Sequence, residues 1–266
     1  MQSMKQSIFF ILLLFSLSIN SQNKTIAPGE KLVFTASYNI SGLLTDIAKV
    51  TMETSEVKTS KSTLMRLKCS AATFSSFDGF FKVRDLYESY VSPKTLTPYL
   101  YKRDIDEGGY YKFMQYTYSP KSKTVKSLKR KKNSKGKFWE EKNTLNIGGS
   151  TKDIVATLYS IRNLDIDKAS PGDTQKFTVL FDNEETTISL KYIGKESIST
   201  KLGRKECYKL AVSVNKSIKG SNALKDSNSN LLWLTADANK IPVLAKFKIP
   251  VGNGELKIAS ASGLKH

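Results

Sequence analysis

Histidine is almost missing from this sequence. The single histidine, His266, is also the last of the 266 residues. Ser–His and Cys–His catalytic pairs need a base held in a fixed place, and chain termini are commonly poorly ordered. A histidine metal site fails for the same reason. We therefore predict no catalytic pair of these types, no metal site and no cofactor.

Cysteine is also scarce, because the chain has only Cys69 and Cys207. Two distant cysteines cannot form a zinc site, and neither follows the N-terminal apolar segment, where a lipid could be attached. An exported chain could join them in a disulfide. However, Cys69 shares the apolar phase of its segment, whereas Cys207 lies opposite the apolar Tyr208 and Leu210. We expect two free, mostly buried thiols in a non-lipidated protein.

Long apolar runs are absent except for one near the N-terminus. Ile8–Leu17 is interrupted only by Ser16, and ten residues are too few to span a bilayer, which takes about 20. Lys5 is the only charge among the first 21 residues, and small Ser21 stands where a cleavage site is expected. This order is typical of a signal peptide at residues 1–21. We expect residues 22–266 to be exported to the periplasm or cell envelope, without membrane integration after cleavage.

Acidic residues are few relative to basic ones. The chain has 42 Lys and Arg against 24 Asp and Glu, a net charge of +18, and favours anionic partners. Residues 121–137 contain nine basic residues and no acid, with an exposed hairpin tip predicted at 130–136. The candidates for binding anionic lipid or polysaccharide are Lys129, Arg130, Lys131 and Lys132. Alternatively, the run only solvates the hairpin. We expect no nucleic-acid binding, because few aromatic residues are interleaved with these charges.

What the sequence does contain is the period-two alternation of β-strands. Leu32, Phe34, Ala36 and Tyr38 lie on one face of a predicted strand, and segments 188–192 and 241–249 repeat the pattern. Turn signals such as Asp78-Gly79, Gly108-Gly109 and Pro171-Gly172 separate the runs. We predict roughly fourteen strands. The expected fold is all-β and mainly antiparallel, with partly closed or curved, barrel-like sheets.

One segment follows helical spacing instead. Ser150 with Asp153 three residues later resembles a capping box, and Ile154, Leu158 and Ile161 follow it at helical intervals. We predict a helix of about 12 residues near 151–162, with Ser150 as its N-cap. The helix would join two β halves of a single domain spanning residues 22–266. Residues 216–230 are mostly Lys, Ser, Asn and Gly and predict a long surface loop.

The order and spacing of several short motifs resemble the DUF3108 family of exported bacterial proteins, whose function is not established. The motifs are Gly29–Leu32, Asp85–Tyr90, Pro98, Arg103, Glu107–Tyr110, the helical pattern Asp153/Tyr159/Arg162, Gly172, Gly203 with Cys207, Trp233–Asp237 and Pro242–Val243. The resemblance implies an antiparallel, partly closed β architecture in the envelope of a Gram-negative bacterium, and it supplies no catalytic residues. More distantly, a curved sheet with a helix is similar to the periplasmic lipoprotein carriers.

These observations favour a non-enzymatic envelope protein that binds an apolar or amphipathic ligand, such as a lipid, in a curved sheet. The candidate lining residues are Tyr87, Arg103, Tyr159, Arg162 and Trp233. The aromatic residues could equally fill an ordinary core, and Arg162 could cap the helix or pair with an acid such as Asp153. Alternative hypotheses are a structural or adhesive protein docking on anionic lipids or polysaccharide through residues 121–137, and an enzyme of unrecognised type.

Overall fold

The computed structural model describes residues 22–266, apart from residues 41, 134–135, 216–229 and 250–251. The predicted signal peptide, the centre of the basic hairpin tip and nearly all of the predicted long loop therefore lie outside the described residues. Among the residues that the structure covers, no helix is both long and apolar enough to cross a membrane.

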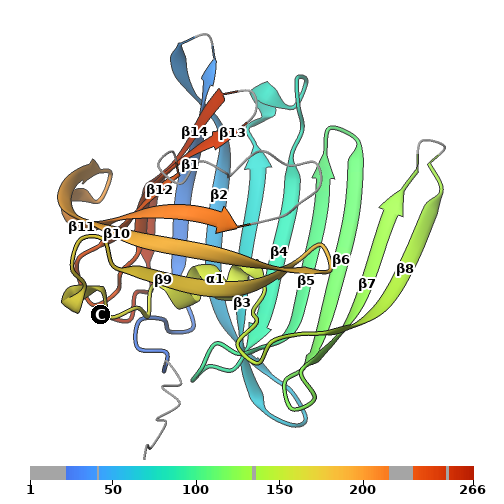
Figure 1. Ribbon diagram of the computed structural model, residues 1–266. Helices are drawn as coiled ribbons and strands as arrows, with labels where there is room; N and C mark the ends of the chain where they lie inside the picture. Colours follow the sequence, from blue (N-terminus) through green and yellow to red (C-terminus); the bar gives the residue numbers. More distant parts are fainter. Residues whose placement is uncertain (1–21, 41, 134–135, 216–229, 250–251) are drawn as a thin grey trace, which may run out of the picture.

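Strands dominate the described residues, and fourteen of them form one sheet (Figure 1). The strands are β1 (Lys31–Ile40), β2 (Leu43–Lys58), β3 (Thr63–Thr73), β4 (Arg84–Val91), β5 (Pro98–Glu107), β6 (Tyr110–Ser119), β7 (Thr124–Lys132), β8 (Phe138–Asn146), β9 (Thr174–Phe181), β10 (Glu184–Thr200), β11 (Gly203–Asn215), β12 (Leu231–Thr235), β13 (Pro242–Ile249) and β14 (Gly252–Ser262). The helices are α1 (Ile154–Ile161) and the short 3₁₀ turns η1 (Ser75–Phe77) and η2 (Ile166–Lys168). The predicted all-β class is confirmed.

The sheet is a meander of antiparallel neighbours with one non-sequential junction. Its order runs from β8 down to β1, then through β14 down to β9, so the first and last strands pair at its centre. The edges are therefore β8 and β9, which are consecutive in sequence. The sheet coils so strongly that β9–β11 pass across the face of the strands that follow β2, yet it does not close (Figure 1).

The open seam between the two edge strands is filled by the chain that connects them. Lys152 forms a parallel bridge with Val179 of β9, with the amide of Lys152 donating to the Thr178 carbonyl at 3.1 Å. Helix α1 follows and contacts β3, β4 and β9. We call the face of the sheet that packs on α1 the inner face. Because it contacts β9 on one side and β3 and β4 on the other, the helix lies inside the coil of the sheet.

Helix α1 is shorter than predicted, and its N-cap is not Ser150. Asp153 is the N-cap, and its carboxylate accepts a hydrogen bond from the backbone amide of Ala156 at 2.8 Å. Because the backbone of Lys152 is tied to β9, the preceding residues stay extended and the helix cannot begin earlier. The prediction that Ser150 caps the helix was therefore wrong, because the cap lies three residues later, at Asp153. The predicted helix itself is present.

Two apolar clusters form the core. The larger lies on the inner face around α1, and a second lies on the opposite face of β9–β12, covered by the chain after α1. Strand β11 is thus apolar on both faces: Cys207 faces the larger cluster, whereas Tyr208 and Leu210 face the second. Cys69 also packs against the larger cluster, so the predicted opposite orientation of the two cysteines was wrong. Both thiols are nevertheless free.

Candidate functional site

A row of side chains with mixed chemistry crosses the inner face from β4 to β8. Tyr87 pairs across the strands with Arg103, Arg103 with Met114, Met114 with Lys129, and Lys129 with Glu141. Directly opposed residues point to the same side of a sheet. Met114 belongs to the larger core cluster, which fixes this side as the inner face.

The next row towards the β5–β6 turn is also basic. Ile105 pairs with Lys112, Lys112 with Lys131, and Lys131 with Trp139. Lys112 is 7% exposed and Arg103 is 3% exposed. Two buried cations on one sheet face need a counter-charge from another element, because an unpaired buried charge is costly.

That counter-charge comes from the β9–β10 turn. Asp182 and Asn183 both have positive φ, 50° and 71°, as a tight turn between two strands requires. The Asp182 carboxylate accepts a hydrogen bond from Arg103 Nη2 and another from Lys112 Nζ at 2.5 Å. The Arg103 guanidinium lies 4.3 Å from the centre of the Phe181 ring. We call Arg103, Lys112 and Asp182 the inner charge cluster.

Asn183 anchors the same turn to the inner face. Its backbone amide donates to the Tyr116 hydroxyl at 2.9 Å, and its side-chain oxygen accepts from the Ser127 hydroxyl at 2.6 Å. The turn therefore joins β5, β6 and β7 without adding a strand to the sheet.

The Asp182 carboxylate is shared by two cations, and this sharing affects the pKa values of Asp182 and Lys112. Burial would raise the pKa of Asp182, but the Lys112 hydrogen bond and both positive charges hold it below its ordinary value. Burial lowers the pKa of Lys112, although Asp182 opposes that shift. Arg103 and Lys112 together carry one positive charge more than Asp182 balances.

Several buried polar atoms near the cluster have no partner within the described part of the chain. They are Arg103 Nε and the hydroxyls of Tyr101 and Tyr118. Tyr101 stacks on Tyr116 with ring centres 5.5 Å apart. Buried polar groups are nearly always hydrogen-bonded, to water or a ligand where the protein offers nothing.

A pair of carboxyl groups lies on the same face, beyond Tyr87. Asp85 is 7% exposed and accepts a hydrogen bond from the Asp106 amide at 3.2 Å. Burial, together with the adjacent Glu107 carboxyl, raises the pKa of Asp85 to about 7. Burial, with a smaller contribution from the Asp85 carboxyl, raises the pKa of the Cys69 thiol to about 11. A thiol with so high a pKa is a poor nucleophile at neutral pH.

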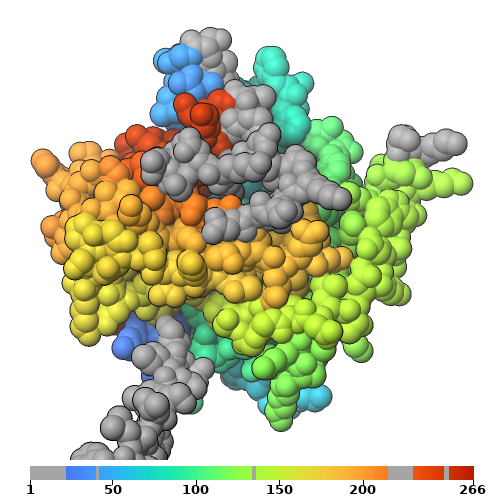
Figure 2. All heavy atoms as spheres, viewed as in Figure 1, coloured from blue at the N-terminus to red at the C-terminus, as the bar shows by residue number. Residues whose placement is uncertain are grey.

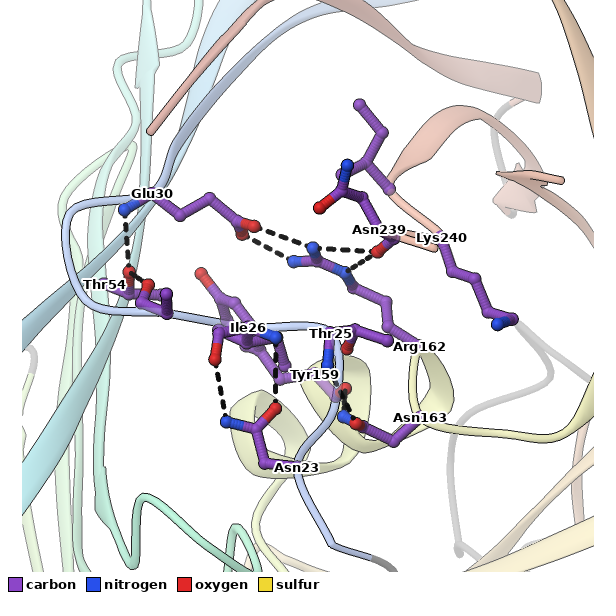
Figure 3. Close-up of polar contacts among 12 residues, drawn as sticks. Asn23, Thr25, Ile26, Glu30, Thr54, Tyr159, Arg162, Asn163, Asn239 and Lys240 are labelled. Carbon is purple, nitrogen blue, oxygen red and sulfur yellow. Dashed lines mark hydrogen bonds and ion pairs between the residues drawn. The ribbon is translucent and has the colours of Figure 1, made fainter. Parts of the chain in front are cut away.

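Arg162 lies elsewhere, in a fully hydrogen-bonded ion pair at the end of α1 (Figure 3). Its Nη1 and Nη2 donate to the two Glu30 carboxylate oxygens at 2.5 and 2.7 Å, and both side chains are 0% exposed. Its Nε and Nη2 also donate to the Asn239 carbonyl at 3.1 and 3.0 Å. The acid is thus Glu30, not Asp153, which caps the other end of the helix. We call this pair the Arg162 clamp.

The clamp holds four segments together. Glu30 is fixed by Thr54, whose hydroxyl accepts from the Glu30 amide at 3.0 Å and donates to the Ala27 carbonyl at 2.6 Å (Figure 3). Asn239, in the β12–β13 turn, exchanges hydrogen bonds of 2.7 and 3.0 Å with the backbone of His266. The clamp therefore links the N-terminal segment, the helix, this turn and the C-terminus.

The five predicted lining residues thus fall in three places. Tyr87 and Arg103 are cross-strand neighbours on the inner face. Tyr159 is buried beside the Arg162 guanidinium, with 5.8 Å between its ring centre and Arg162 Cζ, so both residues lie at the Arg162 clamp. Trp233 stands apart on β12, 3% exposed, with its indole N–H donating to Glu196.

The predicted basic hairpin is formed by β7 and β8, but its basic side chains lie on both faces of the sheet. Because side chains alternate along β7, Lys129 and Lys131 point to the inner face and Arg130 and Lys132 to the outer one. Lys129 binds Glu141 at 2.9 Å, and Arg130 binds Glu140 at 2.5 Å. The sequence could not show that β8 supplies acids to β7.

A surface pocket of about 560 Å³ lies between the β4–β5 turn, the chain before α1, and β9. Lys152 lines it, and burial lowers the pKa of Lys152 to about 8. Its Nζ donates to the carbonyls of Leu96 at 2.8 Å and Thr95 at 3.4 Å. The lysine is therefore engaged in holding the turn, and none of the predicted site residues lines this pocket.

Two members of the inner charge cluster were missed by the sequence analysis. Along β6, Lys112 lies on the same face as Tyr110 and Met114, where the alternation would place an apolar residue. A lysine at such a position was the sequence signal that could have identified it. Asp182 follows a strand and precedes Asn183, which signals a turn. Nothing in the sequence says that this turn reaches Lys112, 70 residues away.

The fold and the inner face define a class: open, barrel-like β proteins whose coiled sheet encloses a helix and a polar cluster. Within it, the chain belongs to the family described as protein of unknown function (DUF3108), whose profile matches residues 33–259.

Two solved structures are similar to this chain. The β-barrel-like DUF1849 protein of Brucella abortus superposes with a TM-score of 0.50 at 8% identity, covering 88% of this chain and 97% of that one. A protein of Bacteroides fragilis, described as exported with a YmcC-like fold, gives a TM-score of 0.35 at 9% identity, covering 91% and 99%. At 8% identity, the likeness to the Brucella abortus protein concerns the fold alone. The chain matches no protein of curated function.

Proposed function

We propose that this protein is a non-enzymatic envelope protein that binds an amphipathic, anionic ligand on the inner face of its sheet. The observation that carries the proposal is the inner charge cluster, in which two buried cations share one carboxylate. The Nε of Arg103, which has no partner among the described residues, supplies a further donor. Buried cations with spare donors favour a carboxylate or phosphate group.

The apolar part of such a ligand has a surface next to these donors. Tyr87 is only half-buried on the same row, and Trp139, at 40% exposure, stands on the row with Lys112. Around α1, in contrast, the protein's own side chains fill the inner face. We therefore assign the ligand to the half of the inner face near the β5–β6 turn. Burial of each methylene there would contribute about 0.8 kcal/mol.

Export to the periplasm or envelope of a Gram-negative bacterium, without lipidation, remains part of this proposal. It is supported by the order of charged, apolar and small residues at positions 1–21. The alternative role, docking on anionic lipids or polysaccharide through residues 121–137, has less support. Lys129 and Arg130 are already paired with acids, and the cations of β7 point to both faces.

The test is native mass spectrometry with solvent extraction of the protein purified from its own envelope. We expect a co-purifying anionic amphiphile, and uptake of a fluorescent fatty acid by the emptied protein. Lys112→Gln should weaken that uptake about tenfold, because it removes one charge-assisted hydrogen bond. Lys126→Gln, an exposed lysine on the outer face of β7, is the matched control. A clean apo mass with no fatty-acid uptake would overturn the proposal.

A further inference from the structure

Exposed apolar side chains gather at one end of the sheet. Of the eleven large hydrophobic residues that are exposed within the described ranges, eight belong to the turns or adjoining strand ends β1–β2, β3–β4, β5–β6 and β7–β8. In an antiparallel meander these four turns share one end, which is uppermost in Figure 1. We call this end the apolar rim. Such clustering is unusual, because scattered single residues are the normal case on a soluble surface.

The first half of the rim projects furthest from the sheet. Leu43 is 71% exposed, and in the β3–β4 loop Phe80 is 89% and Phe81 is 55% exposed. Figure 2 shows the β1–β2 hairpin and this loop standing out at the same end of the molecule. Their backbones are joined, because the amide of Phe74 donates to the Ile47 carbonyl at 2.9 Å.

The second half continues without a break. The Gly108 amide in the β5–β6 turn donates to the Lys82 carbonyl at 2.8 Å, which fixes the turn to the β3–β4 loop. Tyr110 follows this turn, and Phe138 and Trp139 follow the β7–β8 turn at the same end of the sheet. Each of the three is at least 40% exposed. The rim is therefore a continuous structural edge rather than a set of independent loops.

The opposite end of the sheet has a different composition. Its turns at residues 59–62, 92–97 and 120–123 consist of Ser, Thr, Pro and Lys, with the exception of Leu96, which is buried. Outside the rim, the exposed large apolar residues are isolated: Tyr99 in β5, Leu158 in α1 and Ile193 in β10. The asymmetry between the two ends indicates that the rim faces something the other end does not.

We propose that the apolar rim docks on the surface of an anionic phospholipid bilayer. Phe, Leu, Trp and Tyr are the side chains that insert at the boundary between headgroups and acyl chains. Exposed Lys82, Lys132 and Lys137 lie among them, and the chain carries a net charge of +18. Each basic residue near an anionic membrane surface adds about 1 kcal/mol to the attraction. The rim also adjoins the inner charge cluster, because Tyr110 and Lys112 are two residues apart in β6.

The test is flotation of the full mature chain with vesicles of phosphatidylcholine containing phosphatidylglycerol, at low and high salt. Leu43→Ser with Phe80→Ser should reduce the bound fraction at least about tenfold, since it removes two inserting side chains. Both positions are so exposed that the variant keeps its fold. Tyr99→Ser with Ile193→Ser, at 40% and 41% exposure, is the matched control and should float as the wild type does.

The outcomes separate this proposal from ligand binding. Failure of the wild type to float with anionic vesicles at low salt would overturn it. Equal flotation of the Leu43/Phe80 variant would overturn it too, because charge alone would then account for docking. The rim variant should still take up a fluorescent fatty acid in vesicle-free solution, and Lys112→Gln should still float. Loss of uptake with intact flotation would therefore count only against the proposed ligand site.

Discussion

At the scale of single residues, the inner face is distinguished by charged side chains at strand positions that normally carry apolar residues. Lys112 and Asp85 occupy positions where the alternation alone would place hydrophobic side chains. Each is tolerated because another element supplies its partner: Asp182 for Lys112, and the Asp106 amide for Asp85. The cost of burial remains visible in the raised pKa of Asp85.

The raised pKa of Asp85 predicts a pH dependence of stability. The pKa is about 7 in the folded protein and 3.8 ordinarily, so folding favours the protonated form. The free energy of unfolding should therefore fall as the pH rises from about 4 to about 7, where the unfolded chain binds fewer protons than the folded one. Asp85→Asn should remove part of this slope and be more stable than the wild type above about pH 7.

Urea unfolding at several pH values measures this slope. Asp106→Asn is the control, because Asp106 is exposed and neighbours Asp85 on the next strand. If Asp85→Asn kept the full wild-type slope between these pH values, the burial of a protonated Asp85 would be contradicted.

At the scale of elements, helix α1 shows how neighbouring structure sets a helix boundary. Two residues could have capped it, Ser150 or Asp153, and both have suitable side chains. The bridge between Lys152 and β9 keeps the chain extended up to Asp153. Asp153 also accepts a hydrogen bond from the buried Ser89 hydroxyl at 2.7 Å, which orients its carboxylate.

The cap assignment predicts unequal effects of two alanine substitutions. Asp153→Ala should lower the free energy of unfolding by about 1–3 kcal/mol, because it removes the cap and leaves Ser89 without its partner. Ser150→Ala should change it by less than about 0.5 kcal/mol, since Ser150 is exposed and outside the helix. Chemical denaturation compares the two, and equal losses would argue for the earlier helix start.

At the scale of the whole molecule, the sheet is held in its coiled shape by contacts between distant segments. The meander pairs each strand with neighbours, but it does not by itself fix how β9–β11 lie across the first half of the sheet. The Asp182 turn joins the two halves on one side, and the Arg162 clamp joins the chain ends to α1 on the other. Ion pairs and a helix therefore connect parts of the coiled sheet that strand pairing does not join.

Breaking the clamp should therefore destabilise the whole fold. Arg162→Met should lower the free energy of unfolding by about 3–5 kcal/mol, because it leaves the Glu30 carboxylate buried without a partner. Adding Glu30→Met should recover much of that loss. Lys168→Met, which breaks the exposed pair with Asp165, should cost about 0–1 kcal/mol. Urea denaturation measures all three, and an Arg162→Met variant as stable as Lys168→Met would refute a structural role for the clamp.

The strands, their number and their antiparallel character follow from the sequence itself, because alternation and turn residues act over a few neighbouring positions. The family likewise could be inferred from the spacing of short motifs such as Glu107–Tyr110. Tyr87 and Arg103, two of the five predicted lining residues, lie opposite each other because they belong to consecutive strands joined by a short turn. Local signals of this kind need no knowledge of the rest of the chain.

The tertiary structure alone determined the partners across long sequence separations. Arg162 finds Glu30 across 132 residues and Arg103 finds Asp182 across 79, and many acids in the chain would have served either arginine equally well. The face that each β7 lysine occupies, and the gathering of Leu43, Phe80 and Trp139 at one rim, depend on strand order and register. Those follow from how the sheet coils around α1, a property of the packed chain that no local segment encodes.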